Sequence, residues 1–157
     1  MSKKELSSSN EDYLEAIYLL TEEEDEVGAS DIASFLDVKL PSVSEMVRKL
    51  SEKGLVNYEK YGGISLTQRG EEIATEVSRR HDDLMSFLKL LGVNDESARI
   101  DACKVEHVLS QESVEKLRNF LKFVDEAPEK PTWLEHYKHF VKTGEHPECD
   151  RKDKQYR

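Results

Sequence analysis

The sequence predicts a mainly α-helical fold with one small β-hairpin, and three observations support this prediction. Apolar residues recur at spacings of three and four along most of the chain, which is the helical period. Residues 55–67 instead hold two short apolar segments on either side of Gly62 and Gly63, a pattern typical of a hairpin. The 157 residues are 37% hydrophobic and 36% charged, which suits one core or two small ones in a soluble protein.

Three helices are expected before the hairpin. The first begins near Asn10 and ends in the acidic run 22–26. The second is short, and we expect Ser30 to be its N-cap. Pro41 suits the first turn of the third helix, and Gly54 suits its end. Three short helices and a hairpin, within about 70 residues, are the element order of a winged helix-turn-helix, whose third helix enters the DNA major groove.

Further helices are expected after the hairpin, each marked by a capping residue, a glycine or a proline. The last of them precedes a polar tail. The expected helices run from Thr67 to Gly92, from Asn94 or Asp95 to Leu109, from Ser110 through at least Val124, and, after Pro131, over a segment that includes Trp133 to Val141.

Charge and composition exclude several classes of protein. The net charge of −10 argues against coating nucleic acid by bulk electrostatics. The apolar stretches are too short for a membrane span, and the N-terminus lacks the apolar core of a signal peptide. Two cysteines cannot form a disulfide scaffold, so a cytoplasmic location is expected. Charge is also segregated: residues 1–37 hold two lysines against eleven acids, whereas residues 38–61 hold five basic residues against three acids.

The outward face of the third helix is the candidate DNA-reading surface. Its short hydroxyls suit base edges, and its long cations suit phosphates. Glu45 is the exception: it could accept a hydrogen bond from a cytosine amino group or repel wrong sequences. The alternative is an ordinary solvated helix face. The candidate DNA-binding residues, including one in the wing, are Lys39, Pro41, Ser42, Ser44, Glu45, Arg48, Lys49 and Lys60.

A second set of residues suits a metal site. Cys103, Glu106 and His107 stand at i, i+3 and i+4, so one face of a helix is expected to carry all three. His81 interrupts the apolar stripe of the long helix, and Asp12 and Glu15 share a face of the first helix. Each has a simpler interpretation: a small buried thiol, a hydrogen-bonded core histidine, and first-turn acids favoured by the helix dipole. The coincidence of all three sets favours metal binding.

Four segments resemble the diphtheria-toxin-repressor and manganese-transport-regulator family of metal-dependent repressors. They are residues 11–18 (EDYLEAIY), residues 38–47 (VKLPSVSEMV), His81, and residues 101–110 (DACKVEHVLS). Order and spacing match over residues 10–125. The resemblance implies a homodimer that binds a double-stranded DNA operator upstream of metal-uptake genes, with Fe(II) or Mn(II) as corepressor.

The resemblance also implies a ligand set and a domain plan. The implied ligands are Asp12, Glu15, His81, Cys103, Glu106 and His107. The two carboxylates of the first helix resemble the manganese branch of the family, whereas Cys103 resembles the iron branch. The implied plan is a winged helix-turn-helix domain (1–69), an all-helical dimerisation and metal-binding domain (70–143) and a polar tail (144–157), with no SH3-like domain.

Three other interpretations remain open. The chain could be a winged-helix regulator that responds to Cys103 oxidation or to a small molecule, without metal. An enzyme is disfavoured because no general-base helix motif or Gly-rich phosphate loop is present, and no nucleotide cofactor or membrane partner is expected. The tail spacing H-x2-H-x6-H-x2-C could build a zinc site from His136, His139, His146 and Cys149, although the first two also suit the surface of an amphipathic helix.

Overall fold

The structure is a computed structural model that describes residues 6–23, 26–59 and 63–147. It divides into two compact units, Met1–Val114 and Glu115–Arg157. The described residues form, in chain order, α1 (Ser8–Glu23), α2 (Ala29–Leu36), α3 (Leu40–Glu52), β1 (Val56–Tyr58), β2 (Ile64–Leu66), α4 (Gln68–Leu90), α5 (Asp95–Val105), α6 (Gln111–Asp125) and α7 (Thr132–Thr143). The mainly helical prediction with one hairpin is confirmed. No helix among these residues is both long and apolar enough to cross a bilayer.

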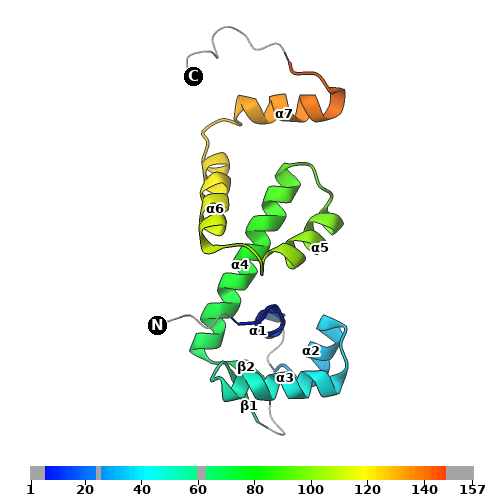
Figure 1. Cartoon of the computed structure of the whole chain (residues 1–157), viewed down its shortest axis with the longest axis vertical. Helices are drawn as coiled ribbons and strands as arrows, with labels where there is room; N and C mark the ends of the chain where they lie inside the picture. The colour runs from blue at the N-terminus through cyan, green and yellow to red at the C-terminus, as the bar shows by residue number, and fades with distance from the viewer. Residues whose placement is uncertain (1–5, 24–25, 60–62, 148–157) are drawn as a thin grey trace. The chain divides into compact units, whose positions relative to one another are not determined.

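The core of the first unit lies where α1, α2 and α3 meet the hairpin (Figure 1). The apolar stripe of α1 is fully buried there, with Leu14 and Ile17 at 0% exposure. In the hairpin, β1 pairs with β2 in antiparallel register, and Ile64 also forms a bridge to Val27 in the α1–α2 connection. The β1–β2 hairpin, called the wing below, is therefore joined to the helical core by backbone hydrogen bonding as well as by side chains.

The joint between the wing and α4 is tightly packed. Thr67 caps α4 as expected: its hydroxyl oxygen accepts a hydrogen bond from the Gly70 amide, and its hydroxyl donates to the Gly54 carbonyl. A Cβ on Gly70 would overlap the carbonyl of Leu55. A glycine at this position lets the first turn of α4 pass close to the backbone of Leu55, the residue before β1.

Two helix limits differ from expectation. The N-cap of α2 is Gly28 rather than Ser30, because the Asp31 carboxylate reaches back and accepts from the Gly28 amide at 2.7 Å. The helix expected to extend through Leu109 ends as α5 at Val105. The chain must reverse before Ser110, which caps α6 by accepting from the Ser113 amide. A turn therefore follows α5 over residues 106–109, with Glu106 as the C-cap of the helix.

The long helix α4 connects the wing to the remainder of the first unit. It packs against α1, and α5 folds back beside it after the turn at Gly92, whose φ is +92° (Figure 1). Asn94 caps α5 as expected, accepting from the Ser97 amide at 3.0 Å. In the second unit, the rings of Phe120 and Trp133 join α6 to α7 at a centroid distance of 5.9 Å.

Candidate metal centre and nucleic-acid interface

Five of the six expected ligands lie together in the first unit. They come from α1, α4 and the turn that follows α5, segments far apart in the sequence. The structure arranges them in two groups whose ligand atoms all lie within 4.8 Å of one another: Asp12, Glu106 and His107 in one, and Glu15, His81 and Glu106 in the other.

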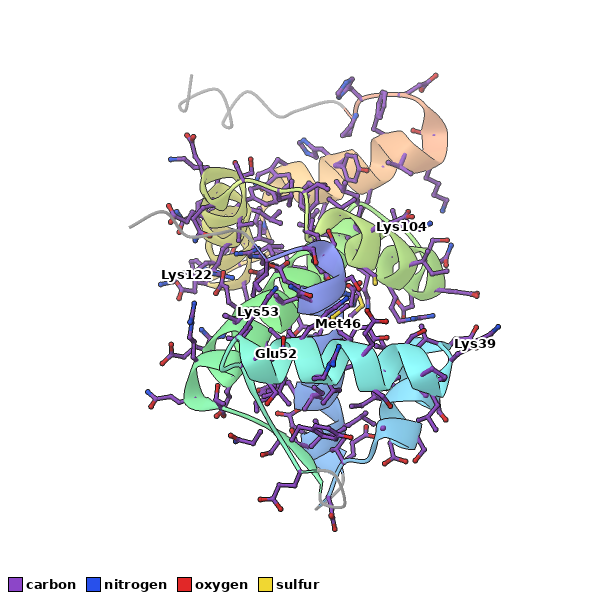
Figure 2. The ribbon with its side chains drawn as sticks, turned by 60° about the horizontal axis from the view of Figure 1, so that its bottom comes forward. Lys39, Met46, Glu52, Lys53, Lys104 and Lys122 are labelled. Atoms are coloured by element: carbon purple, nitrogen blue, oxygen red, sulfur yellow. The ribbon has the colours of Figure 1, made fainter. Side chains whose placement is uncertain are left out.

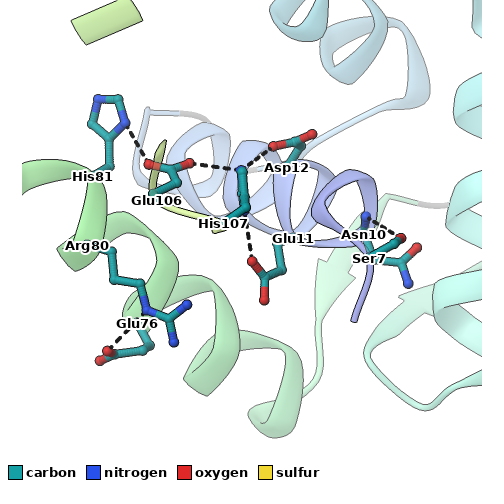
Figure 3. Close-up of polar contacts among 9 residues, drawn as sticks. All are labelled: Ser7, Asn10, Glu11, Asp12, Glu76, Arg80, His81, Glu106 and His107. Atoms are coloured by element: carbon teal, nitrogen blue, oxygen red, sulfur yellow. Dashed lines mark hydrogen bonds and ion pairs between the residues drawn. The ribbon is translucent and has the colours of Figure 1, made fainter. Parts of the chain in front are cut away.

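Glu106 belongs to both groups and lies between two histidines (Figure 3). Its Oε2 is 2.9 Å from His81 Nδ1, and its Oε1 is 3.1 Å from His107 Nε2. The side chain is 0% exposed. Because burial of an uncompensated carboxylate is costly, this position requires cations or strong donors on both sides.

His107 contacts α1 through both ring nitrogens (Figure 3). Nδ1 lies 2.8 Å from Glu11 Oε2 in hydrogen-bonding geometry, and Nε2 lies 2.8 Å from Asp12 Oδ1. Neither Nε2 nor Glu106 Oε1 has a hydrogen bond of acceptable geometry, although both atoms are buried. Buried nitrogen and oxygen atoms that converge without hydrogen bonding are the donor arrangement that a divalent cation requires, so these residues fit a metal ion.

The pKa values of the cluster are strongly displaced. Burial, followed by the charge of Glu106, raises the pKa of Glu15 to about 7. Close polar contacts with the carboxylates of Asp12, then Glu106 and Glu11, raise the pKa of His107 to about 12. Contact with Glu106 raises the pKa of His81. The pKa of Glu106 itself is lowered, because its two histidine partners outweigh burial. Acids and histidines in this cluster thus compensate one another only in part in the absence of a cation.

Cys103 lies outside both groups. Its side chain is exposed on α5, whereas Glu106 and His107 stand beyond the end of that helix. The expectation that one helix face carries all three residues is therefore wrong, because α5 ends at Val105. Burial and then the negative charge of Glu106 raise the pKa of the Cys103 thiol.

Sequence reasoning missed one member of the cluster, Glu11. Its carboxylate contacts His107 from 96 positions away in the chain. Glu11 and Glu15 stand at i and i+4 of α1, so the same helical spacing that selected Asp12 and Glu15 could have included Glu11.

The helix α3 presents the expected polar face (Figure 2). Val43, Val47 and Leu50 are buried. Two pairs of opposite charges lie along the exposed face: Lys49 Nζ is 2.7 Å from Glu45 Oε1, and Arg48 Nε is 3.9 Å from Glu52 Oε1. The side chains expected to contact DNA are exposed at Lys39, Pro41, Ser42, Ser44, Glu45, Arg48 and Lys49, whereas Lys60 lies outside the described residues.

The expected zinc ligands of the tail are only partly described. His136 and His139 lie on α7, and the ring of His146 packs on Phe140 at a centroid distance of 4.7 Å. Cys149 lies outside the described residues. Neither three-residue group that could hold a metal within the described part of the chain includes these histidines.

Comparison with known proteins agrees with this geometry. Residues 5–64 match the family model of the iron dependent repressor, N-terminal DNA binding domain, and residues 67–135 match that of the iron dependent repressor, metal binding and dimerisation domain. An uncharacterized HTH-type transcriptional regulator of Methanocaldococcus jannaschii is 41% identical over 125 residues, which cover 78% of this chain and 100% of that protein.

Two further proteins are similar to this chain. The HTH-type transcriptional regulator MntR of Bacillus subtilis (strain 168) is 39% identical over 118 residues, which cover 75% of this chain and 83% of that protein. The structure of a manganese-dependent transcriptional repressor in complex with manganese superposes with a TM-score of 0.68 at 32% identity, and the match covers 73% of this chain and 53% of that one. This chain thus spans about half the length of that solved repressor. The chain belongs to the iron-dependent repressor family, whose members are metal-dependent DNA-binding transcriptional regulators and not enzymes.

Proposed function

We propose that this protein is a cytoplasmic, homodimeric repressor in which Mn(II) or Fe(II) is the corepressor, and that its operators control metal uptake. The observation that carries the proposal is the position of Glu106, shared by two groups of potential ligands. One group includes Asp12 and the other includes Glu15, both on α1, which is part of the winged helix-turn-helix. A cation bound there attaches the DNA-binding domain to α4 and to the turn after α5.

Electrostatic repulsion explains how binding changes the protein. Asp12, Glu15 and Glu106 bring three carboxylates into one partly buried cluster. A divalent cation supplies positive charge that lets these carboxylates approach one another. Conformations in which α1 is fixed against α4 then bind metal more tightly than conformations in which α1 is free. Metal binding therefore shifts the population toward the conformations with α1 fixed.

The donor set favours a hard divalent metal. Both groups offer carboxylate oxygen and imidazole nitrogen only, because Cys103 lies outside them. These donors suit Mn(II) and Fe(II), whereas Zn(II) and Cu(II) bind more tightly by intrinsic affinity, so supply in the cell decides which metal is present. Glu106 has one oxygen facing each histidine, so its carboxylate would contribute to either ligand group.

The regulator that responds to Cys103 oxidation is the second candidate. A reactive cysteine requires a lowered thiol pKa. The pKa of Cys103 is raised by burial and by the neighbouring carboxylates, which favours the metal-dependent mechanism.

The test uses operators selected from a random-sequence duplex library and the purified full chain. We expect anaerobic addition of Mn²⁺ or Fe²⁺ to strengthen operator binding by at least about tenfold, a coupling of about 1.4 kcal/mol, and a chelator to reverse it. His81→Ala and Glu106→Gln should remove the metal dependence, whereas His139→Ala on α7 is the matched control. Operator binding that is indifferent to metal but sensitive to oxidant in chelator would overturn the proposal.

Dimerisation is tested separately. Two half-sites on duplex DNA require a two-fold symmetric protein, and we propose that residues 70–125 form its interface. Sedimentation should show a dimer at micromolar concentration. A monomer with and without metal would remove the homodimer from the proposal and leave the metal site intact.

A further inference from the structure

Glu11 contacts the metal centre without belonging to either ligand group. Its Oε2 lies 2.8 Å from Nδ1 of His107, in hydrogen-bonding geometry, and its side chain is 18% exposed. The other ring nitrogen, Nε2, faces Asp12 Oδ1 and Glu106 Oε1 (Figure 3). The two nitrogens of an imidazole point in diverging directions. The Glu11 carboxylate is therefore on the far side of the ring from the oxygens that converge on Nε2.

A carboxylate accepts hydrogen bonds, so Nδ1 must carry the proton in this contact. In a neutral imidazole with a protonated Nδ1, the lone pair is on Nε2, which is the nitrogen that faces the other ligands. We propose that Glu11 is a positioning residue for the metal centre: its hydrogen bond to Nδ1 fixes the ring orientation and the tautomer that present Nε2 of His107 to the cation. This inference rests on the proposed metal-binding function.

The backbone supports such a role. Glu11 and Asp12 are consecutive residues of α1, so one turn of that helix holds His107 by both of its nitrogens. Tyr13, Leu14 and Ala16 are buried beside them and fix the rotation of the helix. Since no other hydrogen bond to Nδ1 is found among the described residues, loss of Glu11 removes the contact that holds this nitrogen in place and keeps it protonated.

The first measurement is the Mn²⁺ affinity of the full-length protein, with the variants Glu11→Ala and Glu11→Gln. Outer carboxylate partners of ligating histidines typically contribute about 10–100-fold to metal affinity. We expect Glu11→Ala to lose that factor and Glu11→Gln, which keeps an acceptor oxygen but not the charge, to lose less. Glu22→Gln is the matched control, because it removes one negative charge from the exposed end of the same helix. Wild-type affinity in Glu11→Ala would overturn the inference.

The second measurement separates positioning from a purely structural role. With 15N-labelled histidine and Zn²⁺ as a diamagnetic probe, long-range 15N–1H spectra should show His107 bound through Nε2 with a protonated Nδ1. The His107→Ala variant assigns the signals. Glu11→Ala should give a mixture of tautomers or lose the coordinated signal. An unchanged His107 spectrum together with lower metal-free stability would mean that Glu11 only supports the fold. If the wild-type protein itself binds no Mn²⁺, the proposed function fails rather than the role of Glu11.

Discussion

At the scale of single residues, the candidate metal centre is an arrangement of charges that only partly compensate one another. Glu106 is fully buried and is balanced by His81 and His107. Glu15 is less well balanced: burial and the charge of Glu106 outweigh the two histidines and raise its pKa to about 7. A carboxyl group that binds protons more tightly in the folded protein than in the unfolded chain stabilises the fold at low pH. That contribution is lost as the pH rises from the unfolded pKa of 4.5 through 7.

Glu15→Gln should therefore raise the stability of the metal-free protein at pH 8 and leave it nearly unchanged at pH 4.5. Solvent reaches part of this side chain and screens the repulsion, so we expect a gain of about 1 kcal/mol. Thermal unfolding in chelator at the two pH values measures the difference. Metal-induced stabilisation, tested with Mn²⁺ at pH 8, should decrease in the same variant. A variant less stable than wild type at pH 8 in chelator would contradict the repulsion argument.

At the scale of elements, the sequence predicts those features that depend on local chemistry. Thr67 and Asn94 cap their helices as expected, because capping needs only a side chain and an amide a few residues away. The end of α5 was predicted wrongly, because the helical spacing of apolar residues continues past the last residue of the helix. The chain turns there because the next helix begins after its N-cap, Ser110. Glu11 was missed because its partner lies 96 positions away, a distance over which helical spacing carries no information.

The joint between the wing and α4 provides a prediction at this scale. Gly70→Ala places a Cβ against the carbonyl of Leu55, which is backbone and cannot rotate away. We expect a loss of about 1–3 kcal/mol, the usual range for overpacking a tight site. Denaturant unfolding of Glu72→Ala, an exposed position in the same helix, is the control and should change by no more than about 0.5 kcal/mol. Equal stability of the two variants would contradict this prediction and would mean that the backbone at Leu55 moves aside.

The exposed face of α3 provides a second prediction. Arg48→Ala should weaken binding to all DNA sequences and reduce the slope of log affinity against log salt by about one, because it removes one phosphate contact. Fluorescence anisotropy with specific and random duplexes over a salt series measures both. Lys138→Ala on α7, an exposed lysine paired with Glu135, is the control for loss of one positive charge. If Arg48→Ala instead changes only the preference among sequences, this side chain contacts a base edge rather than a phosphate.

At the scale of the whole molecule, the proposed function depends on coupling between two candidate sites of one compact unit. The candidate recognition helix α3 and the candidate metal centre both belong to Met1–Val114. Helix α1 contributes to each, because its apolar face packs in the core that supports α3 and its acidic face carries potential metal ligands. Metal binding at one face of α1 therefore acts on the element that carries the DNA-binding domain.

Such coupling must be reciprocal, and this gives the last prediction. If Mn²⁺ strengthens operator binding by a certain factor, a saturating operator must strengthen Mn²⁺ binding by the same factor. Competition with a fluorescent chelator, with and without operator DNA, measures the second factor, and anisotropy measures the first. A duplex of random sequence is the control. It binds the positively charged side chains of the protein but does not offer α3 the base sequence of the operator. Glu106→Gln should bring both factors to one, because it removes the carboxylate common to the two ligand groups. A Glu106→Gln protein in which either factor stays well above one would contradict the link through Glu106 and α1.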